Sequence, residues 1–325
     1  RSRAALRSAD AAARAWSGWR RYGAVRLGRA CLDAKLHEEA AAYYEEAIQI
    51  RLRSTPTRPE GQEPLANLYA YLARARAAHG RTKEAVEAVL AAVASCGRDN
   101  EARVRAEKNL VKILCDAKDL DAFAERVDRE AASAQIENLV LRSALGQAYL
   151  ARSDHSRAIH HLEAAVSTDR VDREAFKSLI AAYDASGNAG AAAARLRALA
   201  SSMPREVALW KELGDRLAKL GRPDEAERAY TTLAEVSPDE PEGPALLAAV
   251  RTEQSRHADA AEGWRQVIRV RPREPGGRLG LARALISLKQ PGEAREAIGF
   301  VLGQTWPARF GDVHGEAKAL LEKLR

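Results

Sequence analysis

The chain repeats itself every 34 residues, and this period constrains its fold more than any other feature. Three residue types keep the same phase along the sequence. They are Ala124, Ala158, Ala192, Ala226, Ala260 and Ala294, then Pro204, Pro238 and Pro272, and finally Leu145, Leu179, Leu213, Leu247 and Leu281. A period of about 20–50 residues is typical of an array in which each repeat is one small unit stacked on its neighbours. We therefore expect an elongated array of similar units.

Each period has the pattern of two amphipathic helices joined by a tight turn. In the repeat at 207–240, one apolar stripe precedes the Gly-Arg-Pro-Asp turn at 221–224 and a second stripe follows it. The glycine suits the left-handed end of a helix, and the proline suits the first turn of the next helix. The small residues Gly214 and Ala226 are expected to let the two helix axes approach closely.

These residues resemble the tetratricopeptide repeat (TPR) pattern, in which a Trp, a Leu-Gly pair, a small residue, an aromatic residue and a Pro recur at set positions. The match is carried by Trp210, Leu213, Gly214, Ala226, Tyr230 and Pro238, by Leu145, Gly146, Tyr149 and Ala158, and by Leu27, Gly28, Ala40 and Tyr44. The resemblance implies an all-α, right-handed superhelical solenoid of about eight helix-turn-helix repeats that ends in a capping helix.

The period predicts a repeat array at 21–308, with a basic segment at 1–20 before it and a cap helix at 309–325 after it. The repeats are expected at 21–54, 66–99, 105–138, 139–172, 173–206, 207–240, 241–274 and 275–308. The third is the most degenerate, because Lys112 and Asp128 stand where a small and an aromatic residue are expected. We expect residues 1–20 to be the end of an upstream region of a longer polypeptide, with a bare cap helix as the alternative.

The resemblance also implies that the first helix of each repeat faces a concave groove that binds a peptide or a partner domain. The candidate groove residues are Arg29, Asn67, Arg74, Asn109, Ser143, Gln147 and Lys177. Arg29 and Arg74 occupy equivalent positions in successive repeats, which predicts an anion-binding ladder with Asn67 and Asn109 for a carboxylate or an acidic peptide. The alternative is that both arginines are solvated or pair with nearby acids.

The distribution of charge argues against binding of nucleic acid. The formal net charge is +7, and residues 1–29 already hold eight basic groups against Asp10 alone, so the remainder of the chain is balanced. A nucleic-acid-binding repeat needs a stripe of cations along its surface, so this function is kept only as an alternative. A second alternative is a structural module that docks on a membrane or an acidic neighbour through its basic N-terminal segment. No apolar run approaches the ~20 residues of a transmembrane helix.

No pattern of residues indicates catalysis, a cofactor or a metal site. His37, His155 and His257 fall at turns and are expected to face solvent. The adjacent His160 and His161 should diverge by ~100° on a helix and so fail to share a metal. The three cysteines form no CxxC pair, and unpaired thiols favour a reducing compartment such as the cytoplasm. The sequence thus predicts a non-catalytic protein-interaction scaffold, whose oligomeric state is open.

Overall fold

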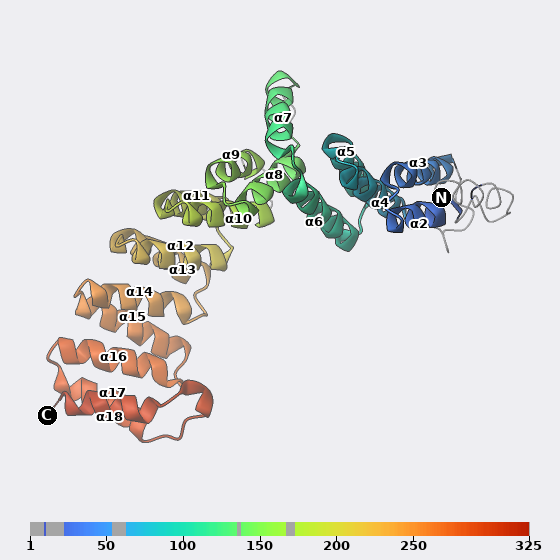
Figure 1. Ribbon diagram of the computed structural model, residues 1–325. Coiled ribbons are helices and arrows are strands. Elements are labelled where there is room, and N and C mark those ends of the chain that lie inside the picture. The colour runs from blue at the N-terminus through green and yellow to red at the C-terminus, as the bar shows by residue number, and fades with distance from the viewer. Residues whose placement is uncertain (1–9, 11–22, 54–62, 135–137, 167–172, 325) are drawn as a thin grey trace. The chain divides into compact units, whose positions relative to one another are not determined.

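The computed structural model describes residue 10 and residues 23–53, 63–134, 138–166 and 173–324. Every regular element in this part is a helix, which confirms the all-α prediction (Figure 1). The chain divides into two compact units, Arg1–Ser186 and Gly187–Arg325, which are described separately below. Apart from Asp10, the basic segment predicted at 1–20 lies outside the described residues.

The N-terminal unit is a row of helices in which α2 pairs with α3, α4 with α5, and α8 with α9. Neighbouring pairs also pack on each other, through α3 on α4 and α9 on α10. The helices are α2 (Ala24–Asp33), α3 (His37–Arg53), α4 (Leu65–Ala78), α5 (Thr82–Ser95), α6 (Asn100–Asp116), α7 (Leu120–Ala134), α8 (Leu139–Ala151), α9 (His155–Val166) and α10 (Arg173–Ala185).

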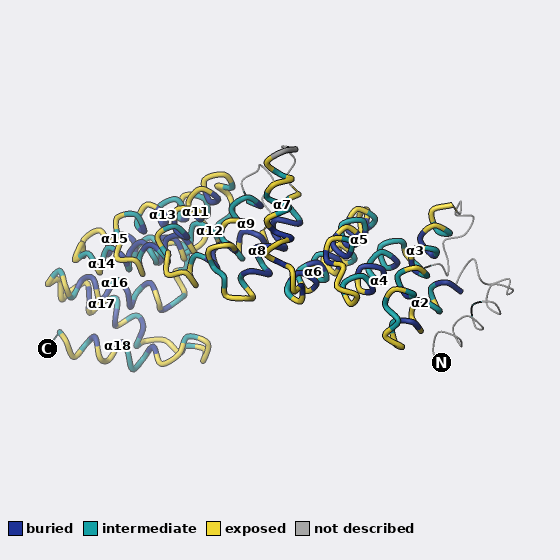
Figure 2. Tube along the Cα trace, turned by 45° about the horizontal axis from the view of Figure 1, so that its top comes forward, coloured by how far each residue is buried: buried dark blue, intermediate teal, exposed yellow. Residues whose placement is uncertain are grey.

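The C-terminal unit continues the same arrangement, with each helix packed on the next and α18 packed on both α16 and α17. Its elements are α11 (Ala189–Ser202), α12 (Val207–Lys219), α13 (Pro223–Val236), α14 (Glu242–Glu253), α15 (His257–Val270), α16 (Pro275–Ser287), α17 (Pro291–Leu302), the short 3-10 helix η2 (Ala308–Phe310) and α18 (Val313–Glu322). Buried residues recur along every α-helix of the unit (Figure 2). The last helix contributes Val313, Ala317 and Leu320 to the core, as a capping helix should.

A left-handed residue recurs in the turn between the two helices of a repeat. The positions are Lys35, Gly80, Ser153, Gly187, Gly221, Ser255 and Lys289, with φ between 56° and 81°. Glycine adopts this conformation without strain, and the other residues are held there by the helices on both sides. The repeat at 105–138 is the exception, because Ala117, the residue after α6, is extended and Asp119 has no positive φ.

A small residue in the first helix provides the close approach that the sequence predicts. Gly28, Gly146 and Gly214 are buried, and each faces the side chain that follows it by 16 residues; a Cβ on Gly28 would lie 2.9 Å from Cε1 of Tyr44. The same position, called the small-residue position below, holds fully buried alanines in three other repeats, namely Ala73, Ala248 and Ala282. Any larger side chain here would push the second helix away.

The third repeat departs from this arrangement. Helix α6 packs on α5 and α8, and α7 projects away from it (Figure 1). Its small-residue position is occupied by Lys112, which is exposed, and its turn lacks the left-handed residue. Both differences remove the conditions for close pairing of the two helices. Ile180 occupies this position in the repeat at 173–206, the repeat in which the division between the compact units falls.

Replacing Gly214 by alanine should lower the free energy of unfolding by about 1–3 kcal/mol, because the new Cβ would overlap the ring of Tyr230. Gly190 is the matched control, since it lies in α11 with no atom near its Cβ direction, and Gly190→Ala should raise stability by about 0.5–1 kcal/mol. Urea unfolding followed by far-UV circular dichroism measures both. Equal stability of Gly214→Ala and the parent chain would refute the role of this position.

Candidate functional site

The first candidate site is a hollow of about 340 Å³ between α2, α3 and α4, called the α2–α4 hollow below. It is lined by Val25, Arg29, Leu32, Asp33, His37, Tyr44, Glu63, Tyr71, Arg74 and Ala78. The structure thus places Arg29 and Arg74 in one lining. The carboxylates of Asp33 and Glu63 stand beside them, so the hollow carries both signs of charge.

Two phenols also line this hollow. The rings of Tyr44 and Tyr71 have centroids 5.5 Å apart. Burial raises the pKa of Tyr44 to about 12, and the nearby Arg29 and Arg74 only partly oppose that rise, so the phenol stays a neutral donor at pH 7. The hydroxyl of Tyr71 donates to Glu63 Oε1 at 3.3 Å.

The second hollow has about 390 Å³ and lies between α4 and α6; it is called the α4–α6 hollow below. It is lined by Ala66, Asn67, Ala70, Tyr71, Arg74, Ala102, Arg105, Ala106 and Asn109. Within the described part of the chain, no carboxylate contributes to this lining, and Arg74 and Arg105 form neither a hydrogen bond nor an ion pair. Two guanidinium groups are therefore available to an anion from solvent.

Three of the predicted groove residues, Asn67, Arg74 and Asn109, meet in the α4–α6 hollow. The Nδ2 of Asn67 donates to Glu63 Oε1 at 2.7 Å, which leaves its carbonyl oxygen free to accept. Arg105 was missed because the repeat pattern places it at the start of a helix. The structure shows α6 beginning at Asn100, with Asp99 as its side-chain cap, so Arg105 lies one turn before Asn109 on the same face.

The other predicted groove residues lie in neither hollow. Ser143 is buried in α8, and its hydroxyl accepts a hydrogen bond from Gln147 Nε2 at 3.1 Å. Lys177 is exposed on α10 and pairs with Glu174 at 2.9 Å. The polar groups of Ser143, Gln147 and Lys177 thus form their contacts with residues on the same helix.

A polar cluster holds α7 against α8 and α9. The buried guanidinium of Arg142 bonds to Asp128, and its Nη1 lies 2.9 Å from Nδ1 of His161. His160 Nε2 lies 3.4 Å from the same Asp128 carboxylate. At the start of α7, Asp121 accepts from the Tyr149 hydroxyl at 3.0 Å.

The sequence predicts that His160 and His161 diverge too far to face one metal ion, but the structure brings both imidazoles to the same carboxylate. Their possible ligand atoms and that of Asp128 all lie within 4.8 Å of one another, because Asp128 reaches from α7 toward both imidazoles of α9. The Arg142 guanidinium already brings a positive charge to Asp128 and His161. The cluster is therefore an ion-pair network that positions α7.

The turn histidines also differ from expectation. His37, His155 and His257 are half-buried at the starts of α3, α9 and α15, with their Nδ1 atoms shielded from solvent. Trp210, one of the residues that carry the TPR resemblance, is half-buried, and its indole N–H donates to the carbonyl oxygen of Pro204 at 2.9 Å.

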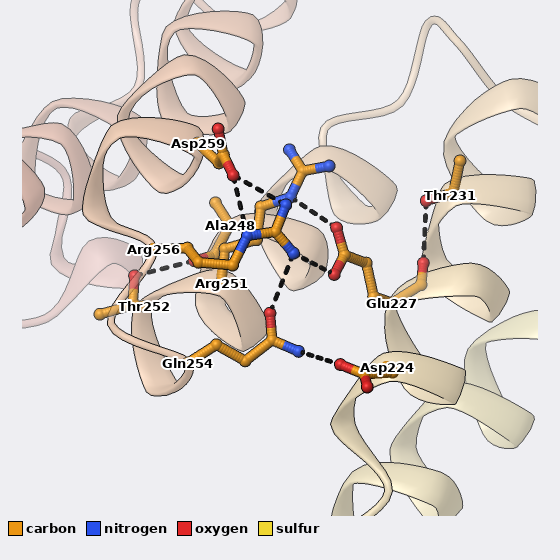
Figure 3. Close-up of polar contacts among 9 residues, drawn as sticks. All are labelled: Asp224, Glu227, Thr231, Ala248, Arg251, Thr252, Gln254, Arg256 and Asp259. Atoms are coloured by element: carbon orange, nitrogen blue, oxygen red, sulfur yellow. Dashed lines mark hydrogen bonds and ion pairs between the residues drawn. The ribbon is translucent and has the colours of Figure 1, made fainter.

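In the C-terminal unit, the arginines around Glu227 form an internal network. Figure 3 shows Glu227 of α13 accepting from Arg251 Nε at 2.9 Å and from Arg256 Nη1 at 2.6 Å. Arg256 also pairs with Asp259 at 2.7 Å, and Gln254 donates to Asp224 at 3.0 Å. This network joins α13 to α14 and α15. Because Arg251 and Arg256 pair with acids of the protein, their charges are not available to a ligand.

Comparison with known proteins identifies the class. A family sequence model described as tetratricopeptide repeat matches residues 1–59, 178–241, 211–262 and 246–299, which together make up more than half of the chain. The chain belongs to the TPR family, whose members are scaffolds for protein–protein interaction. No curated protein sequence matches it.

Solved structures with a similar arrangement include a crystal structure of MamA, which is 16% identical with a TM-score of 0.38 and covers 55% of this chain and 95% of that one. MamA from Desulfovibrio magneticus RS-1 is 16% identical with a TM-score of 0.39, over 54% of this chain and 97% of that one. The TPR2AB domain of yeast Sti1, in a complex with pHSP90, is 16% identical with a TM-score of 0.33, over 91% and 95% of the two chains. Among the residues that the structure describes, no helix has the length and apolar character needed to cross a membrane.

The free energy of unfolding should fall as the pH is lowered from about 6.5 to about 4. Burial lowers the pKa of His161 to about 4, so the unfolded chain binds more protons than the folded chain in this interval. The lowered pKa of Asp128, which bonds to Arg142, adds a loss in the same direction at acid pH. His161→Gln, which keeps an acceptor for Arg142, should flatten the dependence in urea titrations at each pH. His79→Gln, at an exposed site, should leave it unchanged; the same slope in both variants would contradict this account.

Proposed function

We propose that the chain is a non-catalytic scaffold that binds an acidic segment of a partner protein across the first helices of its N-terminal unit. One observation carries the proposal: Arg74 and Arg105 line a single hollow with Asn67 and Asn109, and no described residue pairs with either guanidinium. A carboxylate accepts bidentate hydrogen bonds from such a group, and the amides can pair with the main chain of the same segment.

The charges of the unit favour approach from this side. The helices α2, α4 and α6 hold eight basic and four acidic side chains, whereas α3, α5 and α7 hold five basic and ten acidic ones. An acidic segment is therefore attracted to the first helices and repelled by the second helices. Such complementarity directs encounter and orientation more than it adds affinity.

The shape of the α4–α6 hollow suits an extended chain. Four of its lining residues are alanines, namely Ala66, Ala70, Ala102 and Ala106. Short side chains let a peptide backbone approach the helices, while the arginines and asparagines provide the polar contacts. The groups that line this hollow bind anions and amides, and none of them is a nucleophile at neutral pH, which supports a binding function over a catalytic one.

Fluorescence anisotropy with a labelled peptide of alternating glutamate and serine tests the proposal. Arg74→Glu/Arg105→Glu should weaken binding by more than about 10-fold, because two attractive contacts become repulsive. The control Arg228→Glu/Lys318→Glu reverses two exposed cations of the C-terminal unit and should bind as the parent chain does.

Circular dichroism establishes equal helicity of both variants before titration. Equal affinity of the parent chain and Arg74→Glu/Arg105→Glu would refute the site. Binding of a serine-only peptide with the same strength would refute the requirement for acidic residues.

A further inference from the structure

We propose that the degenerate third repeat is an extension of the binding surface, in which Lys108 and Lys112 continue the α4–α6 hollow along α6. The ligand is then an extended protein segment with acidic residues at alternate positions. The inference rests on the proposed function, and it identifies the pattern of charge in the ligand that the site recognises.

The exposure of Lys112 is the first observation. In six other repeats the small-residue position is buried under the second helix, with glycine or alanine in place. In the third repeat the same position carries an exposed lysine, because α6 packs on α8 and α7 does not cover this face of α6. A buried lysine would need a partner, so the projecting position of α7 is what makes this charge tolerable.

The position of Asp128 is the second observation. It follows Lys112 by 16 residues, the spacing at which Tyr44 faces Gly28 and Tyr230 faces Gly214, so a regular repeat would bring it against Lys112. The carboxylate instead bonds to Arg142 and lies near His160.

The beginning of α7 is fixed away from α6 by further polar contacts. Thr82 donates to Asp119 at 2.5 Å, which ties the start of the helix to α5. Asp121 pairs with Arg157 of α9 at 2.7 Å. As a result, neither Lys108 nor Lys112 has a hydrogen bond or an ion pair within the described part of the chain.

The register of α6 joins these lysines to the hollow. Arg105, Lys108, Asn109 and Lys112 are spaced i, i+3, i+4 and i+7, which places them on one face of the helix over about 10 Å. In an extended peptide, side chains on one side recur about every 7 Å. The rise from Lys108 to Lys112 is about 6 Å, so carboxylates at alternate positions can meet successive cations along α6.

The ends of this face favour a short acidic protein segment over a nucleic acid. Glu101 lies four residues before Arg105, and Asp116 lies four residues after Lys112, so the cationic part is bounded by acids that repel a longer polyanion. Helix α6 also contains no aromatic residue on which bases could stack.

The test compares two labelled peptides of equal length by fluorescence anisotropy, Glu-Ser-Glu-Ser-Glu and Ser-Ser-Glu-Ser-Ser, each flanked by glycines. The parent chain should prefer the first peptide. Lys108→Gln/Lys112→Gln should weaken its binding by about five-fold and reduce the preference, because two exposed charge contacts are lost. The matched control Lys318→Gln/Lys323→Gln neutralises two exposed lysines near the C-terminus and should change neither quantity.

Three outcomes would overturn the inference, and they separate it from the proposed function. If Arg74→Glu/Arg105→Glu abolishes binding but Lys108→Gln/Lys112→Gln does not weaken it, the lysines have no part and the proposed function remains. If neither variant changes binding, both proposals are wrong. If an oligothymidylate of similar charge binds more tightly than the three-glutamate peptide and depends on the same lysines, the surface is a nucleic-acid site.

Discussion

The close crossing of the two helices within a repeat is the interaction on which the rest of the structure depends. A glycine or alanine in the first helix admits a large side chain from the second, as Gly214 admits Tyr230, and a left-handed residue in the turn aligns the two helices. Because each repeat buries its apolar faces only against its neighbours, this local fit is transmitted along the array. A lysine in place of the small residue at the crossing therefore accompanies a change in the direction of a whole helix, as in the third repeat.

The third repeat shows the consequence of losing this fit. With Lys112 at the crossing and an extended residue at the end of α6, α7 is held by the polar groups of the next repeat, above all by Arg142. Arg152 reinforces the altered junction by donating to the carbonyl oxygens of Leu114 and Cys115, at the end of α6. The repeat keeps its two helices but exchanges an apolar contact between them for polar contacts to its neighbours.

The pairing of charges also differs between two local surfaces of the protein. Around Glu227 of the C-terminal unit, arginines neutralise acids on adjacent helices and stabilise the stack. On α4 and α6 of the N-terminal unit, Arg74 and Arg105 form no ion pair with any described residue, so their charge remains available to a partner. The surface that we propose to bind an anionic partner is therefore the one where helix packing leaves arginines unpaired.

The sequence by itself determined the helices, their period and the core positions, because these depend on residues close together along the chain. It also indicated that Arg74 belongs to a surface with Asn67 and Asn109, since the repeat places equivalent residues on equivalent faces. Only the tertiary structure decided that α7 leaves α6, that His160 and His161 meet at Asp128, and that Arg105 joins the hollow. Those outcomes depend on distances between charged groups on helices far apart in sequence, and a periodic pattern contains no information about such distances.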